Sequence, residues 1–184
     1  MSLRAACRLA FLGGVASLAL SCASKPDSSS QPSLQVADVD PAAFRDNVEP
    51  VFERRCASID CHGQVSAGMR LYSEDGLRLP NSDNLAAGSG PTSVAEINAN
   101  YIALVGLQPE LITSVVAKKP NPTADDVRHL LILAKPLQLE RHKGGPALLL
   151  GEPAEECIEI WLQSLMETAQ FNGPALCATG AKPP

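Results

Sequence analysis

The sequence is poor in aromatic residues, in basic residues and in long apolar runs. Only seven of its 184 residues are Phe, Tyr or Trp, and Trp161 is the single tryptophan. A core with so few large rings is either weakly packed or built around another large, flat group. Acidic residues outnumber basic ones, and the formal net charge is −5. This charge argues against binding to nucleic acid and against charge-driven binding to anionic lipid.

The one extended apolar run lies near the N-terminus, at residues 10–20, after the basic residues Arg4 and Arg8. It is too short for a transmembrane helix, so it predicts a secretory signal peptide. A small residue, Ser21, directly precedes Cys22, as in a lipobox. Cleavage before Cys22 would leave this cysteine to be lipidated. The alternative is an ordinary secretory peptide cut near this point, with Cys22 incidental.

A serine-rich segment separates this leader from the rest of the chain. It has no apolar periodicity and cannot bury enough surface to become ordered. We therefore expect a lipoprotein signal peptide at 1–21, a flexible tether at 22–39 and one folded domain at 40–180. Loss of the leader would leave 13 basic and 20 acidic residues, a net charge of −7. This organisation predicts an exported lipoprotein, anchored to a membrane by its lipid and facing the periplasm or the cell surface.

Helical patterns dominate the expected domain, and strand alternation is scarce. Asp40 can cap a helix that begins at Pro41, and apolar residues then recur at helical spacing as far as Phe52. Three more helices are expected: one that begins with a capping box at Ser93, one that Thr123 caps together with Asp126 and that ends at Pro136, and one that begins at Pro153. Two long loops are expected at 63–91 and 137–151, and 109–119 is ambiguous between helix and strand. The fold class is therefore mainly α with long loops.

The segment from Cys56 to His62 carries the strongest chemical signal. Attachment of haem c needs two thiols that add across the vinyl groups of one porphyrin edge, and an imidazole beneath the iron. Cys61 and His62 are adjacent, as this geometry requires. The usual gap between the two cysteines is two residues; here it is four, a gap known among multihaem cytochromes. The segment predicts one covalent haem c, held by Cys56 and Cys61, with His62 as the proximal iron ligand.

Two other interpretations of this segment remain open. Cys56 and Cys61 could form a disulfide with each other. They could also be half of a zinc site, although two further ligands at a suitable spacing are not evident.

From Phe44 to about Ser164 the chain resembles the planctomycete-type cytochrome c-like domains. The matching pieces, in order, are the helix 44–52, Cys61-His62-Gly63, Gly68-Met69-Arg70-Leu71 with Tyr72-Ser73, Asn121-Pro122, the helix 130–133, Lys135-Pro136, His142-Lys143-Gly144-Gly145, and the final helix with Ile160-Trp161-Leu162. The chain departs from the family in its four-residue cysteine gap and at Lys143, where a glycine is common. The resemblance implies a helical haem c domain outside the cytoplasm.

The sixth iron ligand has several candidates. His142 is the first choice, because Gly144 and Gly145 allow its loop to approach a flat ligand closely. Met69, shortly after the attachment motif, is the main alternative. Met166 is a weaker one, since its place near the end of an amphipathic helix favours core packing. An open or water-filled position is the remaining possibility, and His129 is interpreted as a structural or surface histidine.

Cys157 and Cys177 are the remaining cysteines of the expected domain. In an oxidising compartment we expect them to form a disulfide that clamps the C-terminal tail. The closed loop of about 20 residues would contribute roughly 3 kcal/mol to stability. The paired acids at 125–126 and 155–156 fall in the first turns of expected helices, where they favour the helix dipole, so they are interpreted as structural.

Together these features predict a single-haem c-type cytochrome that passes electrons to and from redox partner proteins and is not an enzyme. One rival is a haem-free, disulfide-stapled lipoprotein that acts as a binding module. The other is a haem enzyme with an open iron site, for which no clear distal acid–base residue is evident.

Overall fold

The computed structural model describes residues 40–80, 90–118, 122–164 and 171–182. Within these ranges 49 % of the residues are helical and there is no strand, which confirms the expected mainly α class. One isolated bridge joins Tyr72 to Leu77. The expected leader and tether, Cys22 and Met166 lie outside the described residues. No helix in the described ranges is long and apolar enough to cross a membrane.

The first helical segment is built from three consecutive pieces, α1 (Pro41–Ala43), the π-helical η1 (Phe44–Val48) and α2 (Glu49–Arg55). Asp40 caps its start by accepting hydrogen bonds from two backbone N–H groups at 2.9 and 3.1 Å. The π turn directly precedes Pro50, which has no N–H to donate. A proline crowds the carbonyl four residues earlier, and a wider turn relieves that contact. The helix therefore continues through the proline and delivers the chain to Cys56.

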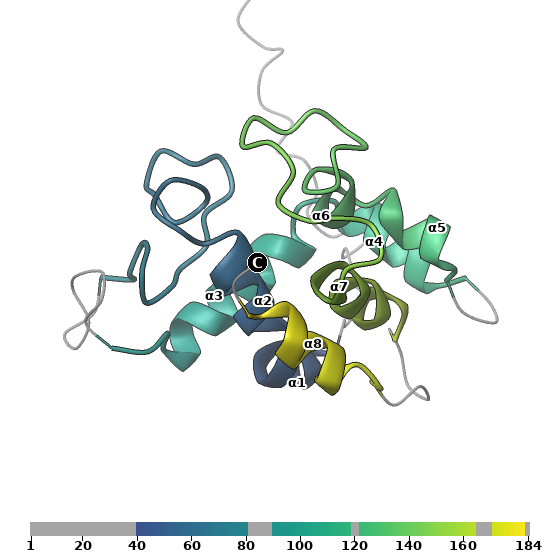
Figure 1. Cartoon of the computed structure of the whole chain (residues 1–184), viewed down its shortest axis with the longest axis horizontal. Coiled ribbons are helices and arrows are strands. Elements are labelled where there is room, and N and C mark those ends of the chain that lie inside the picture. Colours follow the sequence, from purple (N-terminus) through teal and green to yellow (C-terminus); the bar gives the residue numbers. More distant parts are fainter. Residues whose placement is uncertain (1–39, 81–89, 119–121, 165–170, 183–184) are drawn as a thin grey trace, which may run out of the picture. The chain divides into compact units, whose positions relative to one another are not determined.

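The remaining helices are α3 (Val94–Val105), α4 (Pro109–Val116), α5 (Ala124–Arg128), α6 (Leu131–Ala134), α7 (Pro153–Gln163) and α8 (Pro174–Gly180) (Figure 1). The expected capping boxes at Ser93 and Thr123 are both present. The ambiguous segment is the helix α4.

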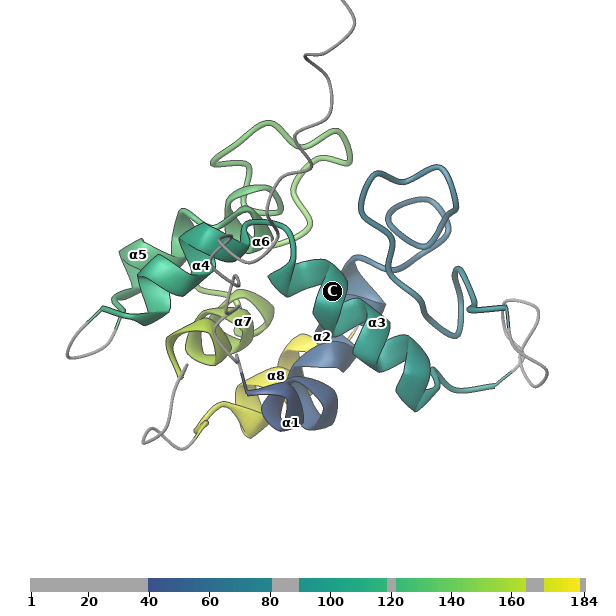
Figure 2. The same ribbon diagram turned by 180° about the vertical axis from the view of Figure 1, so that it is seen from behind.

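One helix prediction was too long, and one helix was missed. The helix expected up to Pro136 is divided into α5 and α6, because the side chain of Gln108 accepts the N–H of Leu131 at 2.7 Å and Leu130 is extended. Helix α8 was missed because its sequence contains Gly and Pro and shows little periodicity. It is joined to α7 by a disulfide between Cys157 and Cys177, and it lies beside α2 and α7 (Figures 1 and 2).

Four of the seven aromatic side chains are gathered in one place: Phe44, Phe52, Tyr101 and Trp161. Phe44 is fully buried, and its ring centre lies 5.2 Å from that of Trp161 and 5.6 Å from that of Tyr101. Phe52 lies 6.4 Å from Trp161 on the same side. Aromatic pairs at these distances stabilise a core beyond the area they bury. These four rings thus form one cluster that fixes helix α2, and with it the start of the cysteine segment.

The long loop after the cysteine segment is held by a buried ion pair. Two guanidinium nitrogens of Arg78 donate to the carboxylate of Glu96 at 2.9 Å each, and both side chains are almost fully buried. Burial disfavours the Glu96 carboxylate, but hydrogen bonds from Arg78, Ser93 and Leu79 outweigh this effect and hold its pKa at about 2. The pair fastens the end of the loop to the start of α3.

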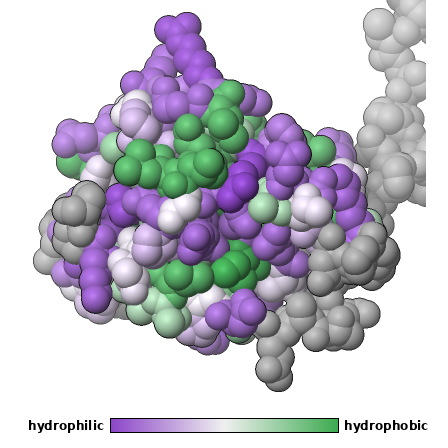
Figure 3. All heavy atoms as spheres, turned by 45° about the vertical axis from the view of Figure 1, so that its right-hand side comes forward, coloured by the Kyte–Doolittle hydropathy of each residue, from purple (hydrophilic) through white to green (hydrophobic). Residues whose placement is uncertain are grey.

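Apolar side chains also occur on the surface. On the face in Figure 3 they form separate patches among polar residues. Leu149 and Leu150, in the loop before α7, are among the most exposed of them.

Candidate functional site

The segment from Cys56 to Gly63 folds into a closed turn at the end of α2. The N–H of His62 donates to the carbonyl of Cys56 at 2.9 Å, and the N–H groups of Cys61 and Gly63 both donate to the carbonyl of Ser58, at 3.0 and 2.9 Å. The four residues between the cysteines therefore fold back on themselves. The turn returns the backbone of His62 to that of Cys56 despite the longer gap.

Ser73 and Gly76, in the loop that follows, pack tightly against this turn. The hydroxyl of Ser73 is buried and donates to the carbonyl of Ala57 at 2.8 Å. A Cβ atom at Gly63 would lie only 2.0 Å from the same carbonyl oxygen, and one at Gly76 would lie 2.2 Å from it. Both positions therefore require glycine. Sequence reasoning missed the contribution of Ser73 and Gly76 to the site. The available signal was the similarity of Gly76-Leu77-Arg78-Leu79 to Gly68-Met69-Arg70-Leu71.

His62 is held in one orientation. Its Nδ1 lies 3.0 Å from the carbonyl oxygen of Met69, and its own carbonyl accepts the N–H of Leu71 at 3.0 Å. Because a carbonyl can only accept, the contact assigns the proton to Nδ1 and leaves the lone pair on Nε2. This is the arrangement by which metal-binding histidines are commonly oriented.

His142 is held in a corresponding way by its own loop. Its Nδ1 lies 2.8 Å from the carbonyl oxygen of Gly145, whose N–H donates back to the carbonyl of His142 at 3.2 Å. Gly145 has φ of +77°, a conformation that favours glycine. The turn therefore also leaves Nε2 of His142 with the lone pair. Among the described residues neither Nε2 atom has a hydrogen-bond partner.

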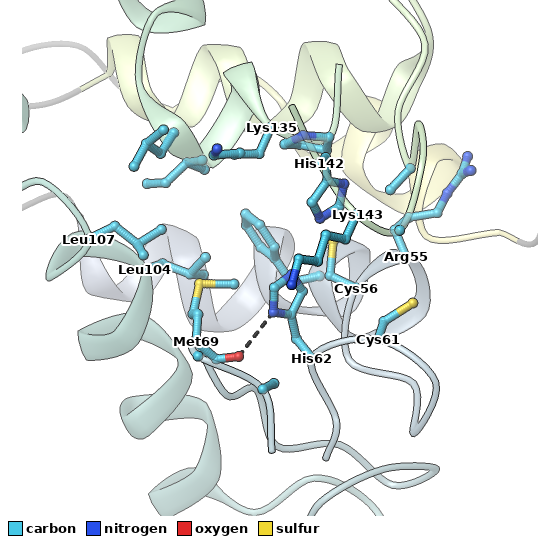
Figure 4. A pocket seen from close by; sticks show the side chains of 18 of the residues that line it. Arg55, Cys56, Cys61, His62, Met69, Leu104, Leu107, Lys135, His142 and Lys143 are labelled. Carbon is cyan, nitrogen blue, oxygen red and sulfur yellow. Dashed lines mark hydrogen bonds between the residues drawn. The ribbon is translucent and has the colours of Figure 1, made fainter. Parts of the chain in front are cut away.

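The two histidines lie across one pocket from each other (Figure 4). Their ring planes are parallel to within 11°, and the ring centres are 6.0 Å apart. A metal ion bonded to one nitrogen of each ring, at about 2.0–2.1 Å, would place the ring centres roughly 6 Å apart. The distance between the ring centres of His62 and His142 is therefore compatible with two imidazoles on one ion, provided that the Nε2 atoms of these parallel rings both turn toward it.

The pocket itself has a volume of about 610 Å³, within the range of about 300–1,000 Å³ that is usual for small-molecule and cofactor sites. Apolar side chains form much of its wall: Phe52, Leu104, Leu107, Leu131 and Ile132. A large, flat, mainly apolar group would fit such a wall.

Both cysteines of the motif line this pocket and are free thiols, so the structure does not join them to each other. Cys56 is buried and Cys61 is exposed. Burial, and then the neighbouring Cys61, raise the pKa of the Cys56 thiol to about 12, against a smaller opposing effect of Arg55. In the folded chain Cys56 is therefore a neutral thiol over the whole physiological pH range.

The other candidate ligands lie differently. Met69 lines the pocket, but its backbone is bonded to His62, so it belongs to the same wall as His62. His129 is exposed and lies 3.8 Å from Asp125 at the surface. Among the described residues no three His, Cys, Asp or Glu side chains form a group that could hold a metal ion. A haem iron would need only two ligands from the protein, because the porphyrin supplies four nitrogens.

Sequence reasoning missed a group of cationic side chains in the pocket wall: Arg55, Lys135, Arg141 and Lys143. Two of them flank His142 in the sequence. This Arg-His-Lys triplet was the available signal.

Comparisons of the chain with protein-family models, with curated proteins and with solved structures find no match.

Proposed function

We propose that the protein is an exported c-type cytochrome with one covalent haem, and that it transfers single electrons between partner proteins. One observation carries the proposal: the parallel rings of His62 and His142 line one pocket with 6.0 Å between their centres, each with Nδ1 on a backbone carbonyl, beside two free cysteines. A bound haem would supply a one-electron couple at its iron. The protein side chains would attach it, orient its ligands and exclude water.

The roles of the four residues follow from their chemistry. The thiols of Cys56 and Cys61 would each add, sulfur and hydrogen together, across one vinyl group, so attachment needs no oxidant. His62 and His142 would hold the iron. Hydrogen bonds from their Nδ1–H groups to backbone carbonyls would make both imidazoles better donors. Two imidazoles give a lower reduction potential than a histidine–methionine pair.

The position of Met69 favours His142 as the sixth ligand. Met69 shares a wall with His62, whereas His142 lies across the pocket from it, so His142 would be the second residue to hold the iron. A filled sixth position also favours electron transfer over the rival function, a haem enzyme with an open iron site.

We also propose a cytochrome c-like domain at 40–180, anchored through a lipid on Cys22 at the periplasmic or cell-surface side of a membrane. The disulfide between Cys157 and Cys177 supports an oxidising compartment, because such bonds are rare in the cytosol.

The test is the intact mass of the purified protein after co-expression with a haem maturation system that tolerates the longer cysteine gap. The mass is expected to exceed that of the chain by one haem, and denaturation should not release the haem. Cys61→Ser should leave at most one thioether bond, whereas Cys157→Ser should leave both. A mass equal to that of the bare chain would refute the proposal in favour of the haem-free binding module.

A further inference from the structure

The wall of the pocket carries a charge opposite to that of the chain. The whole chain has a net charge of −5. The charged side chains that line the pocket, apart from the histidines, are four cations and a single acid: Arg55, Lys135, Arg141, Lys143 and Asp60. An acidic protein with a cationic pocket is suited to a negatively charged occupant.

Two of the four cations are already neutralised by acids of the chain. Arg55 pairs with Glu152, with 3.1 Å between nitrogen and oxygen. Lys135 pairs with Glu140 at 3.3 Å. The side chains of Arg141 and Lys143 have no ion-pair or hydrogen-bond partner among the described residues. Both side chains are exposed to solvent, and the one acid of the pocket wall, Asp60, forms an ion pair with neither of them. Two cations of the pocket wall are therefore free to meet a negatively charged occupant.

Both cations are built into the turn that carries His142. The ammonium of Lys135 donates to the carbonyl of Arg141 at 3.0 Å, and the side-chain amide of Gln138 donates to the carbonyl of His142 at 3.2 Å. Lys143 follows directly and extends into the pocket (Figure 4). The two cations thus stand on either side of His142 on a backbone that is fixed from within the loop.

We propose that Arg141 and Lys143 bind the two carboxylate side chains of the haem, and that this pairing holds the loop closed with His142 against the iron. The inference rests on the proposed function. Two cations of the pocket wall have no ion-pair partner among the described residues, and haem carries two carboxylates. A guanidinium can accept a carboxylate through two parallel hydrogen bonds, and a lysine acts as a point charge beside the other. Because both anchors flank His142, carboxylate binding and iron ligation become one event.

The experiment uses the full chain with Cys56→Ser and Cys61→Ser, so that haem binds without covalent attachment. It is titrated with haem and with haem dimethyl ester, which differ only in the two carboxylates. Adding Arg141→Gln and Lys143→Gln should weaken haem binding about tenfold, a factor that corresponds to about 1.4 kcal/mol. The same change should leave binding of the ester unaltered. The matched control, Arg45→Gln with Lys182→Gln, removes the same charges from outside the pocket and should alter neither affinity.

Three results would overturn the inference. If the double substitution weakens the binding of haem and of its dimethyl ester equally, the cations stabilise the fold or the ligation of the iron and do not bind the carboxylates. Unchanged haem binding would mean that they are solvated surface charges. If neither ligand gives a low-spin spectrum with the chain that keeps both cations, the proposed function fails as well, which separates that outcome from the other two.

A second measurement covers the case in which the serine variant does not fold. In the protein with attached haem, the two cations should keep the pKa of the haem carboxyl groups low. Arg141→Gln with Lys143→Gln should then raise the pH at which the midpoint potential begins to depend on pH, by about one pH unit for a tenfold loss. An identical pH profile in the two proteins would overturn the inference.

Discussion

The imidazole rings of His62 and His142 lie parallel to within 11°, with 6.0 Å between their centres. In each ring Nδ1 is hydrogen-bonded to a backbone carbonyl of the same loop. The carbonyl is that of Met69 for His62 and that of Gly145 for His142. Two loops that are distant in the sequence therefore orient a histidine in the same way, and both histidines line the same pocket.

The first prediction concerns the sixth iron ligand. His142→Ala should open one axial position, convert the haem from low to high spin and allow carbon monoxide to bind the reduced protein. Met69→Ala should leave the spectrum unchanged, because Met69 lies in the wall of His62. Absorbance spectra of the two variants with and without carbon monoxide are the measurement. The reverse pattern, with Met69→Ala opening the iron, would show that methionine is the ligand.

The second prediction concerns Glu49, which is only 3 % exposed. Burial, and then the nearby Glu53, raise the pKa of this carboxyl to about 7, against a weaker lowering effect of the hydrogen bond from Asn100. Because the unfolded chain has a pKa near 4.5, the folded state keeps a proton that the unfolded state loses between these two values. The free energy of unfolding should therefore fall as pH rises from about 5 to 7.

The size of the Glu49 effect follows from the same two pKa values. Each pH unit of that window costs about 1.4 kcal/mol, so the whole effect is at most roughly 3 kcal/mol. Glu49→Gln mimics the protonated acid and should remove this part of the pH dependence. Urea unfolding of both proteins at pH 5, 6 and 7 measures it. If the two proteins lose stability in parallel, Glu49 is not the group responsible.

The third prediction compares two glycines of the same loop. A Cβ at Gly63 would lie 2.0 Å from the carbonyl oxygen of Ala57, whereas a Cβ at Gly68 would meet nothing within 4 Å. Gly63→Ala should lower the free energy of unfolding by about 1–3 kcal/mol, the usual cost of overpacking. It should also reduce the yield of attached haem, because it displaces the turn that joins Cys56 to His62. Gly68→Ala should change neither quantity, and an equal effect of both substitutions would contradict the packing argument.

The fourth prediction concerns Cys22 and rests on the sequence alone. Wild-type protein from a host that lipidates exported proteins should partition into the detergent phase. Cys22→Ala should move the protein to the aqueous phase without altering the haem spectrum. Equal partitioning of the two proteins would favour the ordinary secretory signal peptide.

Sequence reasoning succeeded where structure depends on neighbouring residues. Asp40, Ser93 and Thr123 were identified as helix caps because a capping side chain bonds backbone groups two or three residues away. The pairing of Cys157 with Cys177 was expected by elimination, and the structure contains the same bond. The interpretation of the segment from Cys56 to His62 as a haem attachment site stays a prediction.

Sequence reasoning failed where a distant residue decides the outcome. The predicted helix 123–136 is divided because Gln108, on another segment, takes the N–H of Leu131. Helix α8 forms although its sequence lacks periodicity, since α7 and the disulfide hold it in place. The need for glycine at Gly76 follows from the carbonyl of Ala57, which no local pattern predicts.

The sequence by itself determined the helical class and the starts of α1, α3, α5 and α7, because each of these depends on groups a few residues apart. Only the tertiary structure decided that His142 lies opposite His62, that Met69 shares the wall of His62, and that Arg141 and Lys143 line the pocket without an ion-pair partner among the described residues. Those relationships arise when separate loops are packed against one core, and the distance between their side chains is set by that packing.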